Sequence, residues 1–101
     1  MKAYQRTIEA MREDHRDKLI IDLRKKEDFD KGTYPGAIHL CKDDFEGKIE
    51  ELPKDKPIYL LCYIGETSDE WAEDLQKQGY EIYSLEEGYR GYVRWQLFNQ
   101  L

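Results

Sequence analysis

An apolar run of β-forming residues lies near the middle of the chain, at residues 58–61 (IYLL), directly before Cys62. A run without polar alternation is typical of a strand that is buried on both faces of a parallel sheet. Residues 19–23 (LIIDL) form a similar run that one acid, Asp22, interrupts. Residues 37–40 and 81–85 are further candidates, and a short extended segment precedes a short helix within residues 2–11. The pattern therefore predicts several buried strands, with residues 58–61 at the centre of the sheet.

Helical periodicity appears between these strands. Trp71, Ala72 and Leu75 recur at helical spacing after the central strand, and Gly79 follows where a left-handed cap is favoured. Thr67 and Glu70 have the spacing of a capping box, which predicts that this helix begins there. Further helices are predicted at residues 25–31, at residues 43–52 and after Gly88. The last of these has a predicted inward stripe of Tyr89, Tyr92, Val93 and either Leu97 or Gln96, with Trp95 and Phe98 on its flank.

Strands that alternate with helices predict an α/β fold. We expect a small, open, mostly parallel sheet of four to five strands with helices on both faces. With 101 residues, the chain is long enough for one domain, residues 1–101, with a modest core.

Charge restricts the partners. The formal net charge is −6, and 38% of the residues are charged, while the mean hydropathy is −0.90. The longest basic cluster is residues 24–26 (RKK), so we expect neither nucleic acid nor an anionic membrane as partner. The pattern contains neither an apolar core typical of a signal peptide nor an apolar stretch long enough to span a bilayer, so we expect a cytoplasmic protein.

The chain has two cysteines, Cys41 and Cys62, and two histidines, His15 and His39. Two cysteines are too few for a disulfide framework, and these four residues do not have metal-ligand spacing. We therefore expect no metal site and no cofactor.

Cys62 follows the central strand directly, and a short loop then leads into the helix. Ligands of open α/β sheets bind beyond the carboxyl ends of the strands. Free backbone N–H groups and a helix N-terminus stabilise a thiolate at such a place. These residues alone leave two interpretations open, a reactive thiolate and a small buried apolar side chain.

Three motifs, in order, resemble the single-domain rhodaneses, sulfurtransferases that carry sulfur as a cysteine persulfide. Residues 21–24 (IDLR), followed by Glu27, Phe29, Gly32 and residues 35–37 (PGA), resemble the D-x-R segment and P-G-A turn of that family. Residues 62–68 (CYIGETS) are similar to its C-x-x-G-x-x-S loop, and residues 85–89 (LEEGY) to its closing L-E-G-G-Y stretch. The resemblance covers residues 20–95, nearly the whole chain.

The resemblance implies a ping-pong transfer of sulfane sulfur through Cys62. The donor would be a small sulfane compound or a protein persulfide, and the acceptor a thiol. The persulfide would be held by a loop of six residues, namely Tyr63, Ile64, Gly65, Glu66, Thr67 and Ser68. Asp22 and Arg24 are expected to support the site through a buried ion pair between strand and loop.

The loop departs from the family in its charges. The family often has two arginines in this loop. In this chain Tyr63 and Thr67 occupy their positions, and Glu66 adds an acid. Thiosulfate, a dianion, is therefore expected to be a poor donor. Arg90 and Arg94 in the terminal helix are candidates for the missing charge.

Other functions remain as alternatives. One is a non-catalytic binding or regulatory module, which keeps the fold without the chemistry. A cysteine phosphatase needs an arginine six positions after the nucleophile, where this chain has Ser68; a phosphatase or a reductase is less favoured. We expect a monomer or a weak homodimer.

Overall fold

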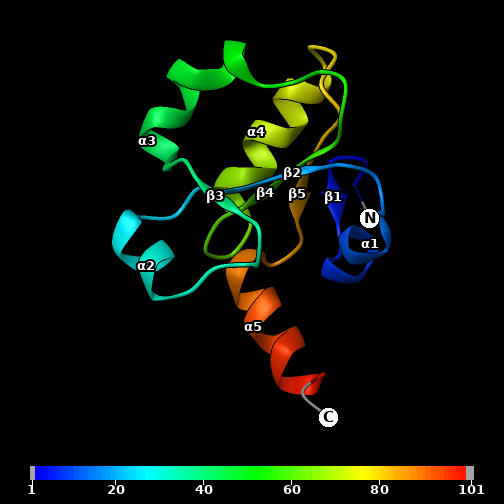
Figure 1. The fold of residues 1–101 in the computed structure, drawn as a ribbon. Helices are drawn as coiled ribbons and strands as arrows, with labels where there is room; N and C mark the ends of the chain where they lie inside the picture. Colours follow the sequence, from blue (N-terminus) through cyan, green and yellow to red (C-terminus); the bar gives the residue numbers. More distant parts are fainter. Residues whose placement is uncertain (1, 100–101) are drawn as a thin grey trace.

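The computed structural model describes residues 2–99, which contain one five-stranded sheet (Figure 1). The strands are β1 (Gln5–Arg6), β2 (Leu19–Asp22), β3 (Ile38–His39), β4 (Ile58–Leu61) and β5 (Ile82–Leu85). Their order across the sheet is β1-β5-β4-β2-β3, and every neighbouring pair is parallel. The predicted α/β fold is confirmed, and β4 is the central strand.

Helices cover both faces of the sheet. They are α1 (Ile8–Glu13), α2 (Lys26–Lys31), α3 (Lys42–Phe45), α4 (Glu66–Gln76) and α5 (Gly88–Phe98), with a 3-10 helix η1 at Glu46–Glu51. Side chains of α3, η1 and α4 pack on one face, and side chains of α1 and α5 pack on the other. The sheet therefore lies between helices on its two faces (Figure 1), with an apolar cluster on each face.

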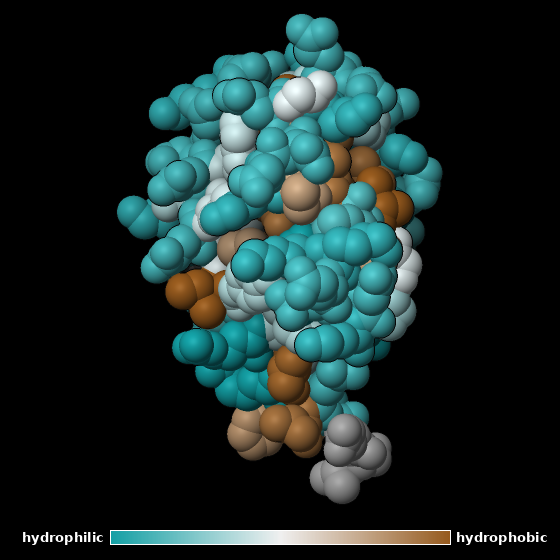
Figure 2. All heavy atoms as spheres, turned by 90° about the vertical axis from the view of Figure 1, so that its left-hand side faces the viewer, coloured by the Kyte–Doolittle hydropathy of each residue, from teal (hydrophilic) through white to brown (hydrophobic). Residues whose placement is uncertain are grey.

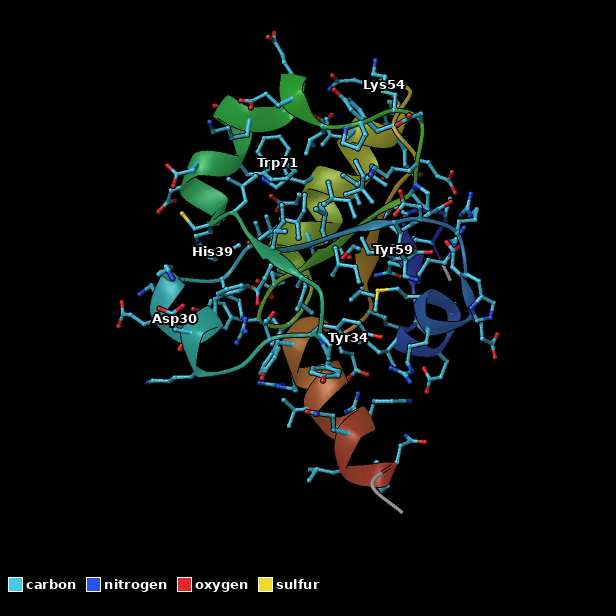
Figure 3. All side chains as sticks on the ribbon, viewed as in Figure 1. Asp30, Tyr34, His39, Lys54, Tyr59 and Trp71 are labelled. Carbon is cyan, nitrogen blue, oxygen red and sulfur yellow. The ribbon has the colours of Figure 1, made fainter. Side chains whose placement is uncertain are left out.

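The side chains of β4 divide between these layers because successive residues of a strand point to opposite faces. Ile58 and Leu60 pack with Leu75 of α4, and Tyr59 and Leu61 pack with the α1 and α5 side. Trp71 lies between α4 and α3 (Figure 3), with its ring 5.1 Å from that of Phe45. Cys62, next after β4, belongs to the α4 layer.

Two predicted helix boundaries were wrong. Residues 43–52 form α3 and then a 3-10 helix, not one α-helix; the interior Gly47, a weak helix former, lies where the helix tightens. The helix α4 begins at Glu66 and has no side-chain cap. The predicted capping box of Thr67 and Glu70 is therefore absent, because both residues already lie inside the helix.

The predicted inward stripe of α5 was also wrong in part. Tyr92 is buried, and Tyr89 and Trp95 pack against the same core. Leu97 and Phe98, in contrast, are 66% and 76% exposed. Apolar side chains gather at the lower end of the molecule in Figure 2, where α5 extends beyond the sheet (Figure 1). The last turn of α5 has no sheet to pack against, so its periodicity did not predict burial.

Within residues 2–99, every helix is too short or too polar to cross a lipid bilayer.

Asp14 joins the end of α1 to the sheet. Its carboxylate accepts hydrogen bonds from Arg16 Nε (2.9 Å) and from the Tyr59 hydroxyl (2.6 Å), and its side chain is 11% exposed. These hydrogen bonds hold the pKa of Asp14 well below its ordinary value, and the one from Arg16 has a larger effect than the one from Tyr59. A carboxyl group whose folded pKa is depressed stabilises the protein above its unfolded pKa, near 4, and loses that contribution as the pH falls.

We therefore expect Asp14→Asn to lower the free energy of unfolding by about 1–2 kcal/mol at neutral pH. The difference from the wild type should shrink between about pH 5 and pH 2. Urea denaturation of both proteins over this pH range measures the difference in the free energy of unfolding. A difference that stays constant with pH would show that the charge of the Asp14 carboxylate does not contribute to stability.

Candidate functional site

Cys62 lies at the carboxyl end of the central strand, at the bottom of an open cleft. Its Sγ accepts a hydrogen bond from the Gly65 N–H (3.1 Å) and lies 3.2 Å from Ser68 Oγ. The residue is 5% exposed. The cleft has a volume of about 260 Å³ and is lined by Leu23, Lys42, Cys62, Tyr63, Ile64, Glu66 and Thr67. A narrow approach to the sulfur therefore exists from solvent.

Gly65 allows the loop to turn toward the sulfur. Its φ of +104° lies in the left-handed region, which is open to glycine at little cost. The first helical hydrogen bond of α4 runs from the Asp69 N–H to the Gly65 carbonyl (2.9 Å). The three amides before Asp69 have no helical carbonyl to donate to, and they give this end of α4 a partial positive charge. The loop thus places the Gly65 N–H and the N-terminus of α4 beside Cys62.

The first residues of α5 hold the loop from the other side. The Tyr89 N–H donates to the Cys62 carbonyl (2.7 Å), and the Arg90 N–H donates to the Tyr63 carbonyl (3.2 Å). A Cβ on Gly88 would lie 2.4 Å from the Cys62 carbonyl oxygen. This close approach of two backbones requires glycine at position 88.

Asp22 and Arg24 form the expected buried ion pair. Arg24 Nη2 lies 2.8 Å from Asp22 Oδ2, and the two side chains are 4% and 0% exposed. The same Nη2 donates to the Gly32 carbonyl (2.6 Å), and the Thr33 hydroxyl donates to Asp22 (2.7 Å). The guanidinium carbon lies 3.6 Å from the centre of the Tyr89 ring. This pair therefore ties β2, the turn after α2 and α5 together, and neither side chain hydrogen-bonds to the sulfur.

Tyr63 and Ile64 form the rim of the cleft, where they are 46% and 45% exposed. The Tyr63 hydroxyl donates to the Asp28 carboxylate and accepts from the Lys25 N–H (3.3 Å). The hydrogen bond to Asp28, with partial burial, raises the pKa of Tyr63. The ring is thus fixed against α2 as a neutral phenol.

Lys42 is a residue of the cleft that the sequence analysis missed. It is the first residue of α3 and lines the cleft with Cys62. A signal was present, because β3 ends at His39, on the same edge of the sheet as the end of β4. The loop itself has no basic residue, but the cleft does have a cation.

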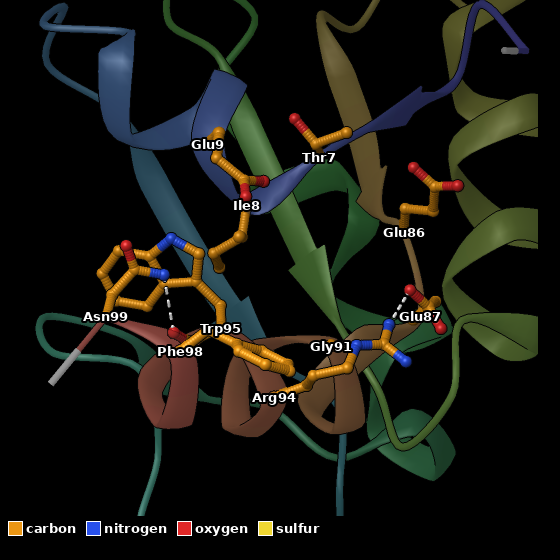
Figure 4. Close-up of a pocket in the computed structure, with 10 residues that line it drawn as sticks. All are labelled: Thr7, Ile8, Glu9, Glu86, Glu87, Gly91, Arg94, Trp95, Phe98 and Asn99. Carbon is orange, nitrogen blue, oxygen red and sulfur yellow. Dashed lines mark hydrogen bonds and ion pairs between the residues drawn. The ribbon is translucent and has the colours of Figure 1, made fainter.

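The candidate Arg94 lies in a different place. It forms an ion pair with Glu87 and lines a separate groove between α1 and α5 (Figure 4). The hydrogen bond from Arg94 lowers the pKa of Glu87. Arg94 therefore does not supply the charge that the Cys62 loop lacks.

Ser84 was also missed. It is fully buried in β5, and its Oγ lies 2.6 Å from Ser68 Oγ. The only sequence signal was a serine inside an apolar strand, which commonly has a purely structural role.

A family model described as a rhodanese-like domain matches residues 5–94. The chain belongs to the rhodanese-like domain family. This match includes the Cys62 loop, the Asp22–Arg24 segment and most of α5. It confirms the resemblance that the three sequence motifs indicated.

Individual relatives agree with this assignment. A tRNA sulfurtransferase of Desulfurococcus amylolyticus is 41% identical over 76 residues, which are 75% of this chain and 15% of that protein. A rhodanese-related protein from Thermoplasma volcanium has the same fold, with a TM-score of 0.80, 20% identity, and 89% and 90% of the two chains covered. An NAD-dependent persulfide reductase from A. fulgidus is 26% identical, with a TM-score of 0.67, over 87% of this chain and 16% of that one.

Segments similar to this chain thus make up most of one of these relatives and a small part of the other two. This chain spans about 15% of the sulfurtransferase that it matches. The substrates and partners of that longer protein are therefore not carried over as properties of this chain.

Proposed function

We propose that this rhodanese-like domain is a sulfurtransferase that carries sulfane sulfur as a persulfide on Cys62. The observation that supports this most is the convergence of the Gly65 N–H and the Ser68 hydroxyl on Cys62 Sγ, within 3.1 and 3.2 Å, at the bottom of an open cleft. Such donors stabilise an anionic sulfur without any side-chain cation. The tRNA sulfurtransferase relative supports the same class of reaction.

The reaction has two balanced steps. In the first, the Cys62 thiolate attacks the outer sulfur of a persulfide donor, RS–SH; the new S–S bond forms on Cys62, and RS⁻ leaves with the bonding electrons. In the second, an acceptor thiolate attacks the outer sulfur of the Cys62 persulfide. The S–S bond breaks, the acceptor becomes a persulfide, and the Cys62 thiolate is restored. Neither step needs an external oxidant or a metal.

The cleft favours a persulfide donor over thiosulfate. Its rim consists of the uncharged side chains of Tyr63 and Ile64, and its charged side chains are one cation, Lys42, and one acid, Glu66. A sulfonate-bearing dianion needs several charge-assisted donors. We expect thiosulfate to react more slowly than a low-molecular-weight persulfide.

Sulfur transfer from a low-molecular-weight persulfide to a thiol acceptor tests the proposal. The wild type should exceed the uncatalysed rate, and Cys62→Ala should not. If the wild type and the variant both remain at the uncatalysed rate with every donor, the chain is a non-catalytic module.

Lys42 should affect the capture of an anionic donor. We expect Lys42→Gln to raise KM for an anionic persulfide about three- to tenfold and to leave kcat nearly unchanged, because the ammonium acts through charge alone. The effect should decrease at high salt. Lys77→Gln, with the same charge change at the exposed end of α4, is the matched control. Equal changes in both variants would contradict a local role for Lys42.

A further inference from the structure

Two buried serine hydroxyls extend the hydrogen-bonding of Cys62 into the core. Ser68 Oγ lies 3.2 Å from Cys62 Sγ, 3.2 Å from the Gly65 carbonyl oxygen and 2.6 Å from Ser84 Oγ. Both serines are fully buried. Among residues 2–99, Ser68 is the single hydrogen-bond partner of the Ser84 hydroxyl. The three side chains therefore form a chain that runs from the sulfur through α4 to β5.

The number of hydrogens limits how this chain can be arranged. A serine hydroxyl has one hydrogen to donate and can also accept. The Gly65 carbonyl already accepts from the Asp69 N–H, so it does not depend on Ser68. A thiolate at Cys62 has no hydrogen and can only accept. When Ser68 donates to the sulfur and not to the Gly65 carbonyl, the hydrogen between the two serines comes from Ser84.

The arrangement differs when Cys62 carries its proton. The S–H group can then donate to Ser68 Oγ, and Ser68 can give its own hydrogen to Ser84. In this arrangement both hydrogen bonds run in the direction opposite to that of the thiolate state. Ser84 thus donates to Ser68 in the thiolate state and is free to accept from Ser68 in the thiol state.

We propose that Ser84 is a positioning residue that orients the Ser68 hydroxyl toward the Cys62 thiolate. Ser84 does not touch the sulfur. It donates a hydrogen bond to Ser68 Oγ, and the Ser68 hydroxyl then donates its own hydrogen to the sulfur. Linked hydrogen bonds strengthen one another in a medium of low dielectric. This inference goes beyond the proposed function, because it concerns the reactivity of the thiol and does not depend on any sulfur donor.

Alkylation of Cys62 by iodoacetamide tests the proposal in the full chain, with Cys41→Ala as the background so that only one thiol reacts. We expect Ser84→Ala to slow alkylation at neutral pH about three- to tenfold, equivalent to roughly one net hydrogen bond. Ser68→Ala should slow it at least as much. At high pH, where every variant is a thiolate, the rates should converge.

The double variant Ser68→Ala/Ser84→Ala makes the test sharper. Because Ser84 acts only through Ser68, the double variant should react no more slowly than Ser68→Ala alone. Its urea midpoint should not be lower than that of Ser68→Ala, since Ser68→Ala alone leaves the buried Ser84 hydroxyl without a hydrogen bond.

Ile82→Val is the matched control, because it removes one methylene from the same buried strand and no donor. The charged groups around the site are the same in all variants: Lys42, Glu66, Asp69, Glu87 and the Asp22–Arg24 pair. If Ser84→Ala lowers the urea midpoint but leaves the pH profile of alkylation like that of Ile82→Val, Ser84 has only a structural role and the proposal is wrong. Failure of sulfur transfer in the wild type would leave this result unaffected.

Discussion

Gly88→Ala should destabilise the protein by about 3–5 kcal/mol and displace the Cys62 loop. The new methyl carbon would lie 2.4 Å from the Cys62 carbonyl oxygen and 2.9 Å from the Tyr63 carbonyl carbon. Both atoms are backbone, so neither can rotate away. The φ of +54° at position 88 adds the cost of a left-handed alanine. Urea denaturation measures the stability, and alkylation of Cys62 measures the state of the loop.

Gly36→Ala separates the clash from the backbone strain. Gly36 also has a left-handed φ, +89°, but nothing lies within 4 Å of a Cβ placed there. This control should cost only about 1–2 kcal/mol and leave the alkylation rate unchanged. Equal losses in the two variants would mean that close packing of α5 against the loop does not matter.

Arg24→Ala is expected to cost about 3–5 kcal/mol, because it leaves the Asp22 carboxylate buried without its cation. Arg24 also donates to the Gly32 carbonyl and covers the Tyr89 ring. A domain of this size has about 5–15 kcal/mol of total stability. The variant should therefore unfold at a much lower urea concentration.

Lys26→Ala is the control for Arg24→Ala. Its ion pair with Asp30 has side chains that are 67% and 55% exposed, and such a pair contributes about 0.5 kcal/mol or less. A loss in Arg24→Ala that is no larger than in Lys26→Ala would contradict the structural role of the buried pair.

The fold could be predicted from the sequence because its strands are short apolar runs. Residues 58–61 have no polar position, and all four are buried in β4. The position of Cys62 at the end of that strand follows directly from the run. The parallel arrangement followed from the alternation of strands with helices.

Details of the site depend on contacts between distant segments. Ser68 and Ser84 are 16 positions apart and meet only when α4 packs on β5. Lys42 comes from another strand-to-helix junction than Cys62 and shares its cleft. Local pattern gave no basis for the contact between the two serines, and for Lys42 it gave only a place at the same edge of the sheet as Cys62.

Local signals also misled at two positions. Thr67 and Glu70 have the spacing of a capping box, but the turn at Gly65 starts α4 one residue before Thr67. Leu97 follows the period of α5, but the helix extends past the sheet and leaves it exposed. The first outcome depends on the conformation of one turn residue, and the second on where the sheet ends.

The most direct test of the central claim is the intact mass of the chain after incubation with a low-molecular-weight persulfide. The wild type and Cys41→Ala should each gain one sulfur atom, which cyanide then removes, and Cys62→Ala should gain none. Uptake of sulfur by Cys62→Ala, or no uptake by the wild type from any sulfane donor, would contradict the account.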